Sequence, residues 1–340
     1  MRIAITADPE IPVPPQLYGG IERIIDMLVQ GLVERGHEVT LFAHPDSLVP
    51  ARLVPYSGLH PQKSWDTLCN TWSITRELAR GHYDLVHSFG RLAYILPILP
   101  WRIPKLMSYQ REPTLSGIRR AVQLSAKGTL TFTGCSDYIA AKIRPYALAY
   151  SIHNGVPMSV YQYQPVVAFD APLVFLGRVE HIKGAHLAID IARQTGKKLI
   201  IAGNVPVDAI SQQYFQNQVQ PYLDDEQIHY IGPVNDAQKN QLLGSAAAFL
   251  MPILWDEPFG IVMAEAMACG TPVIALGRGA VPEVIAHETS GFICNDLGEM
   301  KDAINKINTI DRAVVRRWAE DHFSNEVIVQ QYIELYKKVL

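Results

Sequence analysis

The sequence predicts an α/β protein with two doubly wound parallel sheets, one in each half of the chain. First, 340 residues are enough for two domains of about 100–200 residues each. Second, 48% of the residues are hydrophobic, so each domain can bury a large core. Third, short β-rich runs alternate with helical stretches, which is typical of parallel sheets with crossover helices.

The first half of the chain contains six expected strands. They are Arg2–Ala7, Glu38–Ala43, Asp84–Ser88, Lys105–Tyr109, Thr129–Gly134 and Ala149–His153. The clearest amphipathic helices between them are Ile21–Arg35 and Trp72–Arg80.

A second series of strands begins after residue 171. These strands are Pro172–Gly177, Lys198–Ala202, Gln227–Ile231, Ala248–Pro252, Pro272–Ala275 and Gly291–Cys294. The chain then continues as a helical region, Asp311–Leu340, with a break near Phe323-Ser324-Asn325 where a serine or asparagine can cap a new helix.

These series predict the domain organisation. The polar, proline-containing stretch Pro157–Ala171 reads as a linker, so we expect domains at 1–160 and 161–322 and a final helix at 323–340. Ligands of open parallel sheets bind outside the carboxyl ends of the strands, so two facing sheets would hold a substrate in the cleft between them.

Charge and composition exclude several classes of protein. Residues 1–170 hold 16 Lys and Arg against 13 Asp and Glu, and residues 171–340 hold 14 against 20, which is too little basic charge for nucleic-acid binding. The apolar stretches are short and contain prolines, so we expect neither a membrane span nor a signal peptide. Four scattered cysteines without a C-x-x-C pair suggest small buried residues in a reducing cytoplasm: Cys69, Cys135, Cys269 and Cys294.

Two glycine-containing segments are candidates for phosphate binding. Gly19-Gly20-Ile21-Glu22-Arg23 follows a Pro-rich loop, Asp8–Tyr18, and opens a helix whose amides and dipole favour an anion. In the second half, Gly177-Arg178 and Lys183-Gly184 place two cations at the end of a strand, which suits a diphosphate. The alternatives are a turn that needs glycine geometry and a solvated loop.

The most specific segment is Glu257-Pro-Phe-Gly-Ile-Val-Met-Ala-Glu265. Glu257 is expected in the loop that enters a helix, and Glu265 two turns further along that helix. Helical spacing then puts the two carboxylates about 80° apart around the axis and roughly 12 Å apart along it. They could then not share one proton or one metal, but they could touch two parts of a long ligand. The alternative is a capping acid and a solvated helix glutamate, although Glu265 has apolar neighbours on both sides.

Three other features are weaker. Asp224-Asp225-Glu226 has no metal-ligand spacing and reads as a solvated turn. His87 ends a strand and is either a functional residue or a satisfied core histidine. The basic stretch with Arg111, Arg119, Arg120 and Lys127 is either a solvated helix face or a contact for an anionic acceptor or membrane surface.

Taken in order, these motifs resemble those of glycosyltransferase family 4, the retaining GT-B enzymes, over nearly the whole chain. The matching segments are Gly19-Gly20-Ile21-Glu22, Tyr83–His87, His153-Asn154-Gly155-Val156, Gly177–Gly184, Ile231–Val234, Glu257–Glu265, Ser290-Gly291-Phe292, and a final helix with Tyr332 and Tyr336. The resemblance implies two Rossmann-like domains facing across a cleft, with the last helix crossing back to the first domain. It also implies an acceptor-side first domain and a second domain that binds the nucleotide sugar.

Residue roles follow from the same resemblance. Arg178 and Lys183 would hold the diphosphate and stabilise the leaving nucleotide, and Glu257 would face the transferred sugar. The remaining expected donor contacts are Gly19, Gly20, Gly177, Val234, the amides of Phe259, Gly260 and Ile261, and Glu265 at the ribose. His87 and Gln110 are candidate acceptor or sugar contacts, and neither a metal nor another cofactor is expected.

Gln110 departs from the family pattern, which often has a histidine at this point. Glutamine can hydrogen-bond a hydroxyl group but cannot act as a base near neutral pH.

The sequence thus favours a retaining, metal-independent hexosyltransferase of polysaccharide or glycolipid synthesis. It would use a UDP-glucose-like donor, with GDP-mannose as the runner-up, and act in the cytoplasm or peripherally at the inner membrane face. The alternatives are a nucleotide-sugar epimerase of the same fold and a catalytically weak nucleotide-sugar-binding protein. A dinucleotide-dependent dehydrogenase is disfavoured because neither half contains G-x-G-x-x-G.

Overall fold

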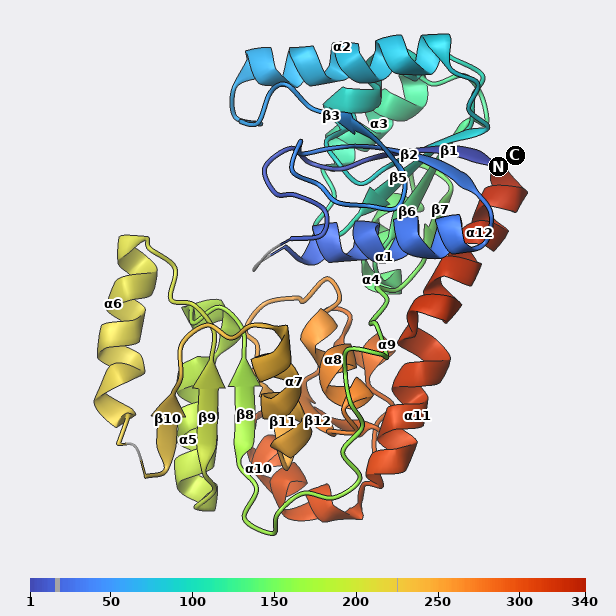
Figure 1. Ribbon diagram of the computed structural model, residues 1–340. Coiled ribbons are helices and arrows are strands. Elements are labelled where there is room, and N and C mark those ends of the chain that lie inside the picture. The colour runs from blue at the N-terminus through green and yellow to red at the C-terminus, as the bar shows by residue number, and fades with distance from the viewer. Residues whose placement is uncertain (16–18, 225) are drawn as a thin grey trace. The chain divides into compact units, whose positions relative to one another are not determined.

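The computed structural model describes residues 1–15, 19–224 and 226–340, and these residues form two compact units. Unit 1 combines Met1–Gly155 with Asn325–Leu340, and unit 2 spans Val156–Ser324 (Figure 1). Unit 1 is therefore discontinuous in the sequence. Each unit contains one parallel sheet, so the predicted pair of doubly wound sheets is confirmed.

The sheet of unit 1 has seven strands in the order β3-β2-β1-β4-β5-β6-β7. They are β1 (Arg2–Thr6), β2 (Glu38–Ala43), β3 (Arg52–Pro55), β4 (Leu85–Ser88), β5 (Lys105–Tyr109), β6 (Leu130–Gly134) and β7 (Ala149–Ser151). The central strands are buried on both faces, as in other parallel sheets. β3 was not among the expected strands, because it is a short, half-exposed edge strand that lacks a continuous apolar run.

Helices cover both faces of this sheet. They are α1 (Gly20–Glu34), α2 (Ser64–Arg80), the 3₁₀ helix η1 (Leu92–Ile98), α3 (Leu115–Leu124), α4 (Asp137–Ile143) and α12 (Asn325–Val339). Figure 1 shows α2 and α3 on one side of the sheet and α1 and α4 on the other. The helix expected at Trp72–Arg80 is only the second half of α2. The first half was missed because its large apolar residues, Trp65 and Leu68, lie on the exposed side and mark no buried stripe.

The carboxyl-terminal helix α12 packs closely against α1 within unit 1. A side chain at Gly31 would bring its Cβ within 2.6 Å of Val329 Cγ2, so the two helices meet at a position that only glycine fills. On its inner face α12 buries Tyr332 and Tyr336. These aromatic rings extend the core of unit 1.

The sheet of unit 2 has six strands in the order β10-β9-β8-β11-β12-β13. They are β8 (Leu173–Leu176), β9 (Leu199–Ala202), β10 (Ile228–Tyr230), β11 (Ala248–Met251), β12 (Val273–Leu276) and β13 (Gly291–Cys294). The helices are η2 (His181–Lys183), α5 (Ala185–Thr195), α6 (Ala209–Gln218), η3 (Gln220–Tyr222), α7 (Asp236–Ser245), α8 (Ile261–Ala268), α9 (Val281–Val284), α10 (Leu297–Lys306), η4 (Ile307–Thr309) and α11 (Arg312–Phe323). The predicted break lies at Ser324, between α11 and α12.

Within residues 1–15, 19–224 and 226–340, no helix is both long enough and apolar enough to cross a membrane. Cys135, Cys269 and Cys294 are buried free thiols, as expected, whereas the free thiol Cys69 is half-buried.

Candidate active site

The predicted site of unit 2 lies at the point where the strand order reverses. The chain passes from β8 to β9 and β10 on one side, and returns to β11 on the other side of β8. Loops that leave adjacent strands in opposite directions open a crevice at their carboxyl ends. The segment Gly177–Gly184 follows β8 and the segment 252–260 follows β11, so the two motifs meet at this edge.

Lys183 and Glu257 form an ion pair across this edge. Lys183 Nζ lies 2.7 Å from Glu257 Oε2, and the side chains are only 18% and 11% exposed. The indole Nε1 of Trp255 donates a second hydrogen bond to the same oxygen, at 2.9 Å, and the ammonium lies 4.7 Å from the Trp255 ring centroid. Glu257 is thus fixed by two donors, one of which is a cation, in a largely dry setting.

Glycine at position 184 allows the two loops to come this close. Gly184 has φ 79°, and a Cβ there would lie 2.0 Å from the carbonyl oxygen of Pro252. Next to it, the Leu254 amide donates to the Ile182 carbonyl at 2.8 Å. The loop after β8 is therefore tied by its backbone to the loop after β11.

Arg178 provides the second cation at the end of β8. Its guanidinium lies 2.8 Å from Glu180 Oε1 and its side chain remains 41% exposed. Gly177, next to it, has open space around its Cα, and Val234, in the loop after β10, is half-buried.

The start of α8 corrects one expectation. Gly260 is the N-cap with a left-handed φ of 74°, so Glu257 lies in the loop before the helix, as expected. Because Glu257 is not itself helical, the angle and distance expected between Glu257 and Glu265 do not apply. The Phe259 side chain is 2% exposed and packs on Phe323, which leaves only its backbone for a ligand. The amide of Ile261, the first residue of α8, points out of the helix start and suits an anion or a hydroxyl group.

Glu265 is buried at 4% exposure, not solvated on a helix face. The Tyr161 hydroxyl and Lys239 Nζ both donate to its Oε1, each at 2.6 Å. The sequence analysis missed Tyr161 and Lys239, because each lies far from Glu265 in the chain and in no recognised motif. Trp255 was missed for the same reason.

The glycine motif of unit 1 forms the start of α1. Gly19 is the N-cap with φ 155°, and a Cβ there would lie 2.6 Å from Pro15 Cβ, whereas the Cα of Gly20 faces open space. Part of the predicted Pro-rich loop, residues 16–18, lies outside the described residues.

His87 is a core histidine, so its expected contact with acceptor or sugar is wrong. It has no exposed surface, and its Nδ1 and Nε2 lie 2.6 Å from the hydroxyls of Tyr336 and Ser108. Burial lowers the pKa of His87 to about 3, so the ring is neutral near neutral pH. Tyr336 comes from α12, so this histidine joins the last helix to the unit 1 sheet.

Gln110 lines a cavity of about 320 Å³ at the carboxyl ends of β4 and β5. Arg91, Arg111 and Glu112 line the same cavity; because Glu112 is paired with Lys142, the two arginines leave the cavity cationic. Beside them lies Asp8, at the end of β1: its Oδ1 is buried and has no hydrogen-bond partner among the described residues, and burial raises the pKa of its carboxyl group. The sequence analysis missed Asp8, although its place after β1 was a signal.

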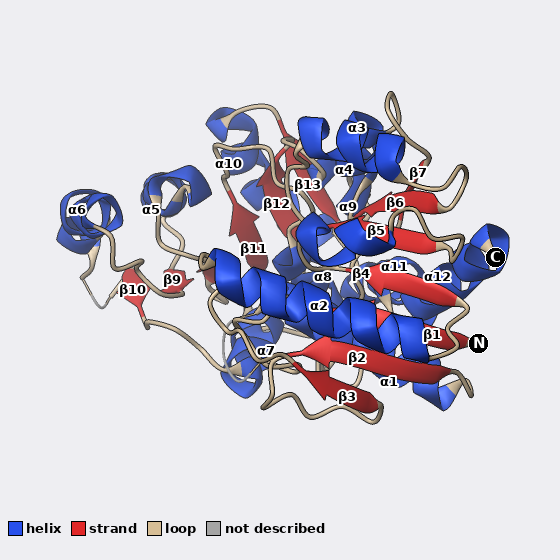
Figure 2. Cartoon of the chain, turned by 90° about the horizontal axis from the view of Figure 1, so that it is seen from above, coloured by secondary structure: helices blue, strands red, loops and turns tan. Residues whose placement is uncertain are grey.

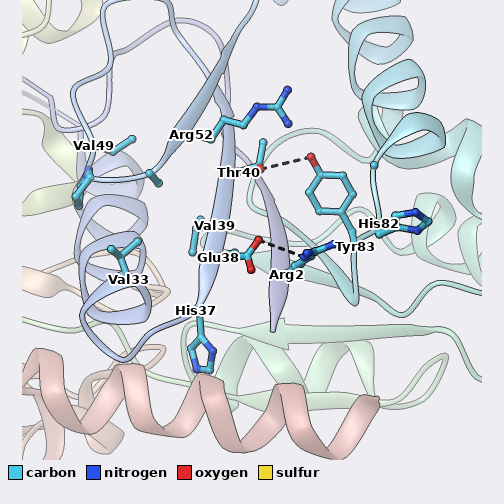
Figure 3. A pocket seen from close by; sticks show the side chains of 13 residues that line it. Arg2, Val33, His37, Glu38, Val39, Thr40, Val49, Arg52, His82 and Tyr83 are labelled. Carbon is cyan, nitrogen blue, oxygen red and sulfur yellow. Dashed lines mark hydrogen bonds and ion pairs between the residues drawn. The ribbon is translucent and has the colours of Figure 1, made fainter.

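A second hollow in unit 1 contains none of the predicted site residues. It measures about 590 Å³ and lies at the amino-terminal ends of β1 and β2 (Figure 3). Arg2 there pairs with Glu38 at 3.2 Å, and the Tyr83 hydroxyl bonds Thr40. Its charges are thus partnered within the protein, at the edge opposite to the one where parallel sheets bind ligands.

The acidic run Asp224-Asp225-Glu226 is structural where it is described. Asp224 Oδ1 accepts the amides of Glu226, Gln227 and Ile228, which makes a turn, while Asp225 lies outside the described residues. Within the described residues, no group of three or more His, Cys, Asp and Glu side chains is arranged to hold a metal.

Two family models match successive parts of the chain. The Glycosyltransferase Family 4 model matches residues 18–160, and the Glycosyl transferases group 1 model matches residues 170–314. The chain is also similar to spore coat protein SA of Bacillus subtilis, with 23% identity over 99% of this chain and 100% of that protein.

Solved structures with the same fold cover nearly the whole chain. AviGT4, a glycosyltransferase involved in avilamycin A biosynthesis, has 25% identity and a TM-score of 0.73, covering 99% of this chain and 97% of that one. HepE of Anabaena in complex with UDP-glucose has 19% identity and a TM-score of 0.76, covering 99% and 100%. At that identity HepE shows the fold alone.

Proposed function

The chain belongs to the glycosyltransferases of the GT-B type, and from this premise we propose that it transfers a hexose from a nucleotide diphosphate sugar to a hydroxyl group of a glycan or glycolipid precursor. The observation that carries the proposal is the Lys183–Glu257 pair beside Arg178, at the switch point of the unit 2 sheet. Unit 2 would therefore bind the donor.

The two cations suit the diphosphate. The Lys183 ammonium has three donors, so it can hold Glu257 and still donate to a phosphate oxygen. Arg178 is exposed enough to add a bidentate contact. Both would stabilise the charge that develops on the leaving diphosphate, so we propose a reaction that needs no bound metal.

The other predicted residues take the remaining parts of the donor. Glu257 would accept hydrogen bonds from the sugar hydroxyls, beside the amides of Phe259, Gly260 and Ile261. Glu265 would bind the ribose through Oε2, because the bonds from Tyr161 and Lys239 both go to Oε1. Gly177 and Val234 would line the diphosphate and the base, and Gly19 and Gly20 would be further phosphate contacts.

The transfer would retain the donor configuration. The bond between the sugar C1 and the diphosphate oxygen breaks while C1 bonds to the acceptor oxygen on the same face. The acceptor proton passes to a leaving phosphate oxygen, so no side-chain base is required. Gln110, which cannot act as a base, would position the acceptor in the cationic cavity of unit 1.

A UDP-hexose is the favoured donor, ahead of GDP-mannose. Its support is a similar protein, HepE, solved with UDP-glucose. We place the acceptor in polysaccharide or lipid-linked synthesis at the cytoplasmic face of the membrane, as the family resemblance implies.

A thermal-shift panel of nucleotides and nucleotide sugars tests this proposal. A ligand that binds only the folded protein raises its apparent stability, so UDP and the true donor should stand out. Arg178→Ala should abolish the shift, whereas the matched control Arg317→Ala, an exposed arginine on α11, should keep it. A shift that persists in Arg178→Ala overturns the diphosphate assignment. NMR of products from donor alone separates the alternatives, because epimerised sugar indicates an epimerase.

A further inference from the structure

The outward side of α2 carries aromatic residues that the core of unit 1 does not use. Trp65, Leu68 and Trp72 are 73%, 60% and 68% exposed, and their i, i+3, i+7 spacing places them in one stripe along the helix. We call these three residues the α2 stripe. Single exposed apolar residues are common on soluble proteins, but three large ones in register mark an interaction surface.

The charges around the α2 stripe are positive. Lys63, just before the helix, and Arg76 and Arg80, further along it, are exposed. The two acidic residues of α2 are partly buried and engaged: Asp66 accepts the His60 amide at 3.0 Å, and Glu77 pairs with Arg52 at 2.5 Å. All residues of α2 are described, and none of its exposed positions holds a carboxylate.

This positive charge extends beyond α2. Residues 62–128 contain ten Lys and Arg but only four Asp and Glu, in a chain whose net charge is −3. α3 lies on the same side of the sheet as α2 (Figures 1 and 2) and exposes Arg119 and Arg120. This stretch of sequence is therefore basic, and its exposed cations on α2 and α3 are Arg76, Arg80, Arg119 and Arg120.

We propose that the α2 stripe binds an anionic lipid surface. Indole rings favour the boundary between headgroups and acyl chains, and lysine and arginine beside them contact lipid phosphates. Because the stripe runs along the helix axis, α2 would lie in the plane of the membrane surface. A second copy of the chain fits this face less well, since a symmetric contact would bring these cations against one another. This inference rests on the proposed function in one respect, the location of the acceptor at a membrane. It does not depend on the proposed donor site.

Vesicle flotation of the full chain tests the proposal. The probes are vesicles of phosphatidylcholine alone and of equal parts phosphatidylcholine and phosphatidylglycerol. The wild type should float with the mixed vesicles, and W65A/W72A should weaken this binding at least about tenfold because it removes both interfacial indoles. R76Q/R80Q should also weaken it about tenfold, and added salt should weaken the wild type.

The matched control is V207A/I210A, which removes two exposed apolar side chains of unit 2, 97% and 80% exposed. It should bind mixed vesicles as the wild type does. Thermal unfolding and the UDP-induced shift should be unchanged in W65A/W72A, which separates a failure of this inference from a failure of the donor proposal.

Three results overturn the inference. They are absence of wild-type binding to mixed vesicles, undiminished binding by W65A/W72A, and equal binding to neutral and anionic vesicles. If light scattering shows a dimer that W65A/W72A converts to a monomer while vesicles are not bound, the α2 stripe joins two copies and the lipid assignment is wrong.

Discussion

The ion pair between Lys183 and Glu257 should be measurable as a coupling energy in the ligand-free protein. Its atoms are 2.7 Å apart and both side chains are less than one fifth exposed. Removing one partner of a buried pair costs about 3–5 kcal/mol, because the other charge is left without compensation. Here Trp255 still donates to Glu257, so Lys183→Met should cost about 2–4 kcal/mol.

A double-mutant cycle isolates this term. Glu257→Gln keeps an oxygen for the Trp255 indole but removes the charge. The destabilisation of the double variant K183M/E257Q should therefore be smaller, by about 2 kcal/mol, than the sum of the destabilisations of the two single variants. The assay is urea unfolding of all four proteins, with the slope compared to detect a change in the unfolded state. A coupling below about 0.5 kcal/mol would mean that solvent screens the pair, and the reasoning that Lys183 is held in place before the donor binds would fail.

Four further outcomes are expected. Gly203→Ala should destabilise by more than about 3 kcal/mol in thermal unfolding, because its Cβ would lie 1.8 Å from the Gly177 carbonyl oxygen at φ 135°. The wild type should lose stability in urea unfolding as pH falls from 6.5 towards 3, because His87 takes up a proton in the unfolded chain but stays neutral in the folded one. This loss is at most about 4–5 kcal/mol, and the stabilisation is complete above pH 6.5. His87→Gln should make this pH dependence flatter. Asp8→Asn should raise the acceptor KM about tenfold in steady-state kinetics without changing the donor KM, because a charged hydrogen-bond acceptor is lost. Removal of divalent metals with EDTA should leave the transfer rate unchanged.

Each outcome has a contrary result. Gly177→Ala faces open space and is the control for Gly203→Ala, so equal stability of the two variants would show that the backbone contact is absent in solution. An unaltered pH slope in His87→Gln would mean that other groups cause the acid sensitivity. A higher donor KM in Asp8→Asn would place this residue on the donor side, and inactivation by EDTA that added metal reverses would refute the metal-independent mechanism.

The sequence predicted the fold well because both domains use strong local signals. β-rich runs buried on both faces alternate with amphipathic helices, and neither signal depends on distant residues. The helix at 64–80 was only half found, because Trp65 and Leu68 face solvent and reverse the expected pattern. β3 was missed since an edge strand needs little apolar surface.

The candidate site could be predicted only in its motif residues. Lys183 and Glu257 were named separately from their positions after strands, and the pairing between them follows from the strand order, which places β8 beside β11. Tyr161 and Lys239 both bond Glu265, which is distant from them in the sequence. No motif spacing along the chain could therefore predict these contacts. His87 was ambiguous for the same reason, because the Tyr336 hydroxyl that satisfies it lies 249 positions away.

The discontinuity of unit 1 has a consequence for the order in which the protein is made. Residues 156–324 are synthesised before α12, so the whole of unit 2 has been translated while the Tyr336 hydroxyl that bonds His87 is still missing from unit 1. During this interval the apolar side of α1 that α12 will cover, including Gly31, faces solvent or a chaperone. The amino-terminal domain is therefore the last to be completed, and a premature stop after unit 2 would damage the domain that was translated first.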